Sequence, residues 1–175
     1  MKWGVLVEKW DVYNKDGKLT GKTTTRHNIF ELGEYHLGVS LWIINQNGEL
    51  LIQKRAASKR IHPNIWSTTG GSVISGETSM QGCIRETKEE IGLQIHEDDL
   101  VLLSRSLGKD TIFDDYITIK EFPIENAVIQ PNEVSEVKWV SAKDIAQLFS
   151  LGLFMLDDIK DIEKVFQYID GHIRV

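Results

Sequence analysis

The sequence contains one cysteine and three prolines among 175 residues, and long runs of apolar side chains are missing. A single cysteine excludes an intramolecular disulfide and a zinc site built from several cysteines. The longest apolar stretches, at residues 41–44 and 151–156, are far shorter than the roughly 20 residues that cross a bilayer. The first residues also lack the apolar core of a signal peptide. The sequence therefore predicts a cytoplasmic protein that does not enter a membrane.

Positive charge is also in short supply. Twenty Lys and Arg side chains stand against 26 Asp and Glu, which gives a net charge of −6. Because a polyphosphate backbone repels such a chain, we expect no nucleic acid polymer as a partner. The 41% hydrophobic and 26% charged content is typical of a globular protein. Without repeats or linkers, residues 1–175 are expected to form one domain, in which residues 1–34 are an N-terminal elaboration.

Hydrophobic patterns predict strands and helices in mixed order. Residues 5–13 and the turn at 14–17 indicate an N-terminal β-hairpin extension, whose polar continuation at 18–34 is typical of a surface flap. Further strands are predicted at residues 36–44 and 49–54, near 66–69 and 99–104, and at 111–122 and 134–140. Helices are predicted at residues 78–92, 141–149 and 157–169. This order favours an α/β fold, a mixed sheet covered by helices.

Three glutamates share one side of the predicted helix at 78–92. Glu86, Glu89 and Glu90 stand at i, i+3 and i+4, so their carboxylates project in nearly one direction. Like charges at this spacing repel each other, and a hard divalent cation would relieve the repulsion. Taken alone, the pattern also fits a solvated acidic face. The residues that precede the helix distinguish this interpretation from a cation site.

The preceding glycine-rich segment makes the pattern specific. Gly71, five residues, Glu77, seven residues and then Arg85-Glu86-Thr87-Lys88-Glu89-Glu90-Ile91-Gly92-Leu93 resemble the Nudix hydrolase signature, G-x5-E-x7-R-E-U-x-E-E-x-G-U, where U is bulky aliphatic. The departure is Thr87, whose hydroxyl we expect to bond to the Cys83 carbonyl. The resemblance implies a Nudix-type α/β/α sandwich around a mixed β-sheet. It also implies Mg²⁺ or Mn²⁺ as cofactor and hydrolysis of the diphosphate linkage of a nucleoside diphosphate derivative or similar small molecule.

The same resemblance implies a role for each matching position. Glu86 and Glu90 correspond to metal ligands, Glu89 to a further ligand or the general base, and the carbonyl of Gly70 to another ligand. Arg85 belongs to the same catalytic set, because it corresponds to an arginine that orients the carboxylates by pairing with the glutamate at position 77. A base from outside this segment stays open, and the candidates are Asp114, Asp115, Glu133 and Glu136.

Positive charge is concentrated at residues 54–60, against the acidic average of the chain. Arg55 and Lys59 are the candidate substrate-binding residues, since cationic side chains pair with phosphate oxygens. The predicted partner is therefore a small-molecule diphosphate substrate, and the sequence leaves a homodimer open.

Two other functions compete with hydrolysis. Asp11, Tyr35-His36 and residues 51–55 resemble the Nudix subgroup related to isopentenyl diphosphate isomerases. Those isomerases use a cysteine just before the signature and a histidine-rich metal site, whereas residues 66–72 contain neither residue type. The other alternative is a Nudix-like domain that binds a ligand without catalysis. All the signature carboxylates are present here, which favours the hydrolase.

Overall fold

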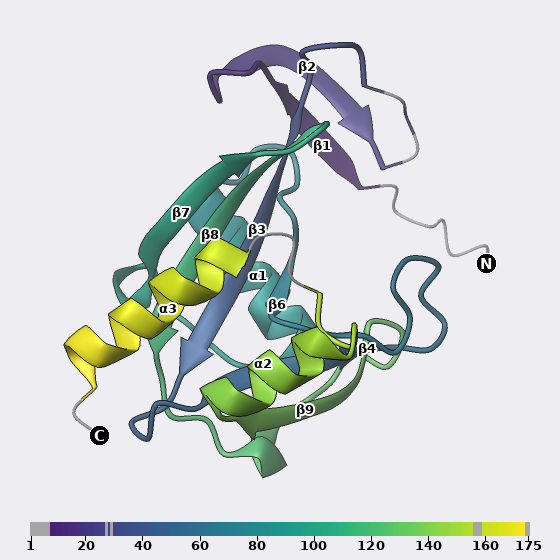
Figure 1. Ribbon diagram of the computed structural model, residues 1–175. Helices are drawn as coiled ribbons and strands as arrows, with labels where there is room; N and C mark the ends of the chain where they lie inside the picture. Colours follow the sequence, from purple (N-terminus) through teal and green to yellow (C-terminus); the bar gives the residue numbers. More distant parts are fainter. Residues whose placement is uncertain (1–7, 27, 29, 156–158, 174–175) are drawn as a thin grey trace.

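The strand β3 (His36–Ile44) carries a hydrophobic core on each of its faces. In the computed structural model, which describes residues 8–26, 28, 30–155 and 159–173, Val39 and Leu41 point into one core and Trp42 and Ile44 into the other. Successive side chains of a strand point to opposite faces, so a strand that is apolar on both faces needs cover on both. Helices supply this cover (Figure 1).

The sheet around β3 is mixed, as predicted. Its strands run in the order β5-β4-β3-β8-β7, while β6 pairs with β3 and β9 pairs with β4. β3 and β8 are parallel, from the pair His36 and Thr111 to the pair Ile44 and Ile119, and the other pairs are antiparallel. The strands other than β3 are β4 (Leu50–Arg55), β5 (Trp66–Ser67), β6 (Thr69–Ser72), β7 (Val101–Leu107), β8 (Thr111–Ile119) and β9 (Val134–Val140).

Helices lie on both faces of the sheet, which confirms the α/β/α sandwich. α1 (Ser79–Ile91) packs against the core of Val39, and α2 (Ala142–Ser150) and α3 (Ile159–His172) pack against the core of Trp42. Figure 1 shows α2 and α3 on the near side of the sheet and α1 behind it. The first two residues of the last predicted helix, 157 and 158, lie outside the described residues. No helix among the described residues is long and apolar enough to cross a membrane.

The bounds of α1 follow from local chemistry. The Thr78 side chain accepts a hydrogen bond from the Gln81 backbone, and the Gln81 side chain accepts one from the Thr78 backbone, which together form a capping box. Gly92 ends the helix with a φ of 77°, a left-handed conformation that favours glycine. Thr87 is buried and donates to the Cys83 carbonyl at 2.8 Å, so the expected hydroxyl contact is confirmed.

The N-terminal extension is a hairpin with its own two-stranded sheet, formed by β1 (Lys9–Tyr13) and β2 (Leu19–Thr25). The hairpin prediction is confirmed, although residues 5–7 lie outside the described residues. Within residues 18–34, where the sequence predicts a surface flap, residues 19–25 form β2. β2 is largely exposed on both faces, so it lacks the alternation of apolar and polar side chains that reveals most strands.

An aromatic stack attaches this hairpin to β3. The Trp10 ring lies 4.4 Å from the His36 ring, and Phe30 stacks on His36 at 5.5 Å. Burial lowers the pKa of His36, so its imidazole is neutral within the stack at pH 7. Two backbone hydrogen bonds of 2.8 and 2.9 Å between Tyr13 and Tyr35 complete the attachment.

Cys83 provides a test of the packing between α1 and the sheet. Its thiol is 1% exposed, and burial raises its pKa from 9.0 to about 12. At pH 9 the native protein should therefore react with iodoacetamide at least about tenfold more slowly than the protein in denaturant, because the thiolate is the reactive form. Mass spectrometry of labelled samples measures the two rates. Equal rates would show that α1 does not cover this thiol.

Candidate active site

Two consecutive glycines of β6 bring the backbone against the carboxylates of α1. A Cβ at position 71 would lie 2.4 Å from the carboxyl carbon of Glu86, and a Cβ at position 70 would lie 2.2 Å from the Val39 carbonyl oxygen. Neither contact is sterically possible, so only glycine fits at either position without a shift of its neighbours. Gly71 thus leaves room for Glu86 beside β6, and Gly70 allows β6 to lie close against β3.

Glu90 is buried between α1 and the sheet. It is 4% exposed, and its Oε2 accepts hydrogen bonds from Gln53 Nε2 at 2.7 Å and from the Gly70 backbone N–H at 3.1 Å. Burial raises its pKa to about 8, against the effect of these two donors, and the nearby charges of Glu86 and Glu133 raise it further. Glu90 is therefore not part of a solvated acidic face, because β4 and β6 cover it.

Glu86 and Glu89 lie closer to solvent. The Glu86 side chain is 16% exposed, and burial raises its pKa although Arg85 lies only 2.9 Å away. The charges of Glu89 and of Glu8 from the hairpin add to this rise. The Glu89 side chain is 52% exposed, with Arg85 at 3.2 Å, so it forms the solvent edge of the cluster.

The Arg85 guanidinium connects these carboxylates to the loop before α1. It donates to both carboxylate oxygens of Glu77, at 2.8 and 3.1 Å, and to the Ser72 carbonyl at 2.9 Å. Its Nη1 also donates to Glu86 and Glu89. Burial alone would lower the pKa of Arg85, but the carboxylates of Glu77 and Glu86 outweigh burial and raise it. The predicted pairing of Arg85 with Glu77 is confirmed.

Replacing Arg85 should destabilise the protein. Arg85→Ala leaves Glu77, Glu86 and Glu89 without their shared cation, so we expect a loss of about 2–3 kcal/mol and a fall in Tm of roughly 5–10 °C. Thermal unfolding followed by circular dichroism measures this change. Lys88→Ala is the matched control, because Lys88 is an exposed cation of the same helix. Equal Tm values for both variants and the unmodified protein would refute the role of the Arg85 network.

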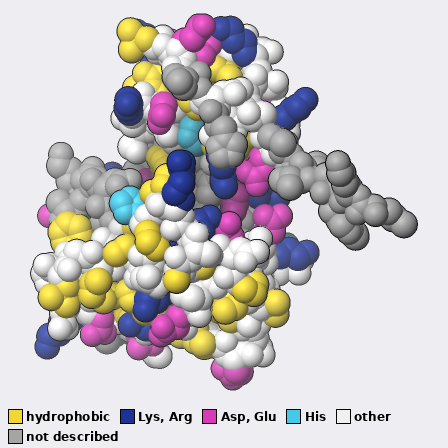
Figure 2. All heavy atoms as spheres, turned by 90° about the vertical axis from the view of Figure 1, so that its right-hand side faces the viewer, with side chains coloured by type: hydrophobic (Ala, Val, Ile, Leu, Met, Phe, Trp, Pro, Cys, Tyr) yellow, Lys and Arg dark blue, Asp and Glu magenta, His cyan; other side chains and the backbone are white. Residues whose placement is uncertain are grey.

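The N-terminal hairpin holds the turn between β6 and α1. Asp11 accepts hydrogen bonds from Ser75 Oγ at 2.6 Å and from the Gly76 backbone at 2.9 Å, and Ser75 N–H donates to the Lys9 carbonyl at 2.7 Å. Figure 2 shows acidic side chains at the waist between the hairpin and the main body, with basic side chains beside them. The sequence gives no signal for this contact, because its partners are 64 residues apart.

The two candidate substrate-binding residues lie in different surroundings. Lys59 forms an ion pair with Glu133, the carboxylate whose charge raises the Glu90 pKa, so Lys59 lies on the Glu90 side of the molecule. Arg55 instead donates to the Ile61 carbonyl at 3.2 and 3.3 Å, within the loop that follows β4. The structure thus brings Lys59 near the carboxylate cluster, while Arg55 supports the loop.

Two of the candidate bases from outside the signature lie on the wrong face of the sheet. Asp115 accepts a hydrogen bond from Ser40, whose side chain points away from the α1 side because its neighbour Val39 faces α1. Glu136 is in register with Lys54, whose ammonium lies 5.8 Å from the Trp66 ring in the core of α2 and α3. Cross-strand partners share a face, so Glu136 also points away from Glu90. Among the candidates from outside the signature, Glu133 is the one whose charge raises the pKa of Glu90.

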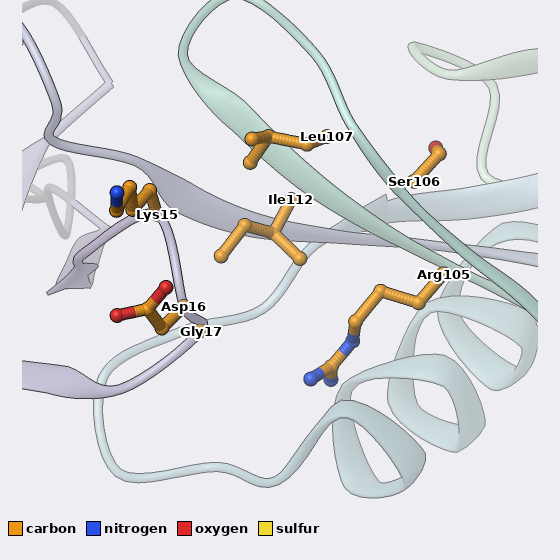
Figure 3. A pocket seen from close by; sticks show the side chains of 7 residues that line it. All are labelled: Lys15, Asp16, Gly17, Arg105, Ser106, Leu107 and Ile112. Carbon is orange, nitrogen blue, oxygen red and sulfur yellow. The ribbon is translucent and has the colours of Figure 1, made fainter.

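The remaining outside candidate, Asp114, is paired with an arginine that lines a separate hollow. Its carboxylate binds Arg105 through two hydrogen bonds of 2.5 and 2.6 Å. The hollow has a volume of about 170 Å³, less than the roughly 300 Å³ of small ligand pockets. Figure 3 shows Arg105 extending toward the β1–β2 turn at its rim. The lining residues are Lys15, Asp16, Gly17, Arg105, Ser106, Leu107 and Ile112, without any signature carboxylate.

The cluster on α1 has the chemistry of a site for a hard cation. Glu86 is partly buried and Glu90 is buried, one helical turn apart on α1, and a divalent cation would stabilise their ionised forms. Gly71 leaves the space that a Cβ would fill beside Glu86. Among the described residues, no three Asp, Glu, His or Cys side chains already form a metal-binding group. Glu86 and Glu90 therefore fit a cation by their chemistry, while Arg85 binds both Glu86 and Glu89.

Comparison with known proteins identifies the class to which this fold and site belong. The model of the NUDIX domain family matches residues 34–157, and the chain belongs to this family. An uncharacterised Nudix hydrolase of Listeria monocytogenes is 36% identical over 156 residues, which cover 85% of this chain and 89% of that protein. As a Nudix hydrolase, the protein is an enzyme that hydrolyses phosphorus-containing anhydrides in small-molecule substrates.

Solved structures show the same fold. A crystal structure of a Deinococcus radiodurans protein matches with a TM-score of 0.72 at 23% identity, covering 91% of this chain and 98% of that one. The NUDIX domain of Shewanella oneidensis NrtR, solved in complex with ADP ribose, matches with a TM-score of 0.61 at 18% identity, covering 81% and 90%. By contrast, an isopentenyl-diphosphate isomerase of Salmonella heidelberg is 36% identical over only 61 residues, 34% of each chain.

Proposed function

We propose that this Nudix hydrolase cleaves the diphosphate linkage of a nucleoside diphosphate derivative and requires Mg²⁺ or Mn²⁺. The observation that carries the proposal is the placement of Glu86 beside Gly71 and of Glu90 beside Gly70, where burial raises the pKa of both carboxyls. Carboxylate oxygens in such a pair suit a hard cation, which accepts one or two protein carboxylates and keeps positions for phosphate oxygens. Glu86, Glu90 and the Gly70 carbonyl are the proposed ligands.

The bound cation would neutralise charge on the diphosphate and make a bound water more acidic. Glu89, the exposed carboxylate at the edge of the cluster, is the proposed general base, which accepts the proton of the attacking water. The water oxygen forms a bond to one phosphorus atom, and the bond from that phosphorus to the bridging oxygen breaks. Arg85 does not need to touch substrate, because it orients Glu86 and Glu89 through its own hydrogen bonds.

Lys59 is the proposed contact for a substrate phosphate. Its ammonium pairs with Glu133, the carboxylate whose charge raises the pKa of Glu90, so Lys59 is a cation on the Glu90 side of the cluster. A nucleoside diphosphate derivative is favoured as the substrate class because the NUDIX domain of Shewanella oneidensis NrtR, which shares the fold, binds ADP ribose. The proposal for this chain concerns the class of compound, a diphosphate that joins a nucleoside to a second group.

The first test is hydrolysis of nucleoside diphosphate derivatives, including ADP ribose, with and without metal. We expect release of a monophosphate in millimolar Mg²⁺ or Mn²⁺ and none in excess chelator. Glu90→Gln and Glu89→Gln should each lower kcat by ~10²-fold or more, because each removes a ligand or the base. Circular dichroism controls for folding. Turnover that persists in chelator would refute the metal requirement, and unchanged kcat in both variants would refute the roles of the two glutamates.

A second test concerns the binding of the substrate phosphate. Lys59→Ala should raise KM by about tenfold and change kcat much less, since a charged hydrogen bond to phosphate contributes roughly 1.5–3 kcal/mol. Lys54→Ala is the matched control, because the Lys54 ammonium lies near Trp66 on the other face of the sheet. Steady-state kinetics at saturating metal gives both constants. Equal KM values for the two variants would remove Lys59 from the substrate site.

A further inference from the structure

Gln53 is a buried polar side chain on β4, where it follows three apolar residues. β4 begins with Leu50, Leu51 and Ile52, and Gln53 follows them at 3% exposure. Its Nε2 donates to Glu90 Oε2 at 2.7 Å. Its Oε1 is buried and has no hydrogen-bond partner among the described residues. A buried amide with one unpaired oxygen is a poor choice for stability alone, because the oxygen has lost its water without gaining a partner.

The geometry around Glu90 indicates what this amide does. Both donors, Gln53 Nε2 and the Gly70 backbone N–H, bind the same carboxylate oxygen, Oε2. The other oxygen, Oε1, takes part in neither hydrogen bond. Two donors that come from different strands, β4 and β6, fix the rotation of the carboxylate about its axis. The carboxylate therefore presents a defined oxygen instead of rotating between two equivalent ones.

We propose that Gln53 is a positioning residue that orients Glu90 so that Oε1 faces the cation site. This inference rests on the proposed function, since it concerns the cation that Glu86 and Glu90 are proposed to bind. Residues that hydrogen-bond to a metal ligand generally set its orientation, and their loss weakens metal binding by roughly 10–100-fold. The Gly70 donor is a backbone N–H, which a substitution does not remove. Of the two donors to Glu90, only the Gln53 amide can therefore be removed by mutation.

The test measures Mn²⁺ binding to the substrate-free protein by electron paramagnetic resonance of the free ion. Gln53→Met keeps a similar volume and removes the donor, and we expect it to weaken Mn²⁺ binding by about 10–100-fold. Gln53→Asn keeps the amide but withdraws it by one methylene, and we expect a loss in the same direction. Ile52→Val is the control for a small loss of packing in the same strand, and it should bind Mn²⁺ as the unmodified protein does.

Kinetics provides a second readout. The Mn²⁺ concentration that gives half-maximal activity should rise in Gln53→Met, while the substrate KM at saturating Mn²⁺ should stay unchanged. If Gln53 only stabilised the fold, its loss would not change the Mn²⁺ requirement selectively while leaving the substrate KM unchanged. If Gln53→Met fails to fold, the Mn²⁺ affinity of Gln53→Asn decides the question.

The outcomes separate this inference from the proposed function. If Glu90→Gln loses Mn²⁺ binding but the folded Gln53 variants bind as the unmodified protein does, the positioning role is refuted and the proposed metal site stands. If the unmodified protein itself binds no Mn²⁺ and hydrolyses its substrate in chelator, the proposed metal site fails first, and the role of Gln53 fails with it.

Discussion

The Arg85 guanidinium is the interaction on which the geometry of the site depends. One planar cation binds Glu77 on the loop, the Ser72 carbonyl at the end of β6, and Glu86 and Glu89 on α1. Lysine could not replace it, because a single ammonium lacks the forked set of donors that reaches partners in several directions. Without this cation, the three carboxylates that converge on it would repel one another, and the loop would lose its connection to the helix.

Burial of acidic groups has two consequences at this site. Glu90 is kept out of water by β4 and β6, which raises its pKa to about 8, and Glu86 is partly covered in the same way. Burying ionised carboxylates without a counter-charge lowers the stability of the folded protein. The same arrangement favours a cation, since a cation supplies the charge that solvent would otherwise screen. Under the proposed function, stability and cation binding are therefore opposed at these residues.

The N-terminal hairpin is part of the structure around the site as well as an extension of the sandwich. Asp11 holds the turn at Ser75 and Gly76, and Glu8 is near enough to raise the pKa of Glu86. The aromatic stack of Trp10 on His36 fixes the position of this hairpin relative to β3. The hairpin contains no signature residue, yet it supports the loop that carries part of the signature. From the sequence alone, this segment was predicted only to be an N-terminal elaboration.

The sequence by itself determined what depends on neighbours along the chain. The capping box at Thr78, the stop at Gly92, the bond from Thr87 to Cys83 and the pairing of Arg85 with Glu77 all join residues within eight positions of one another. Helical spacing predicts the contacts within α1, whereas the pairing of Arg85 with Glu77, which precedes the helix, follows from the resemblance to the Nudix signature. The signature itself is local for the same reason, and it identified the family before any contact was known.

Only the tertiary structure decided which distant residues meet in and around the signature. Gln53 reaches Glu90 across 37 positions, and Lys59 reaches Glu133 across 74. The pleat and register of the sheet placed Asp115 and Glu136 on the far face, although their residue type and position in the sequence made them equal candidates. A one-residue change in register would reverse these faces. Register is set by packing between strands far apart in the chain, so no local pattern records it.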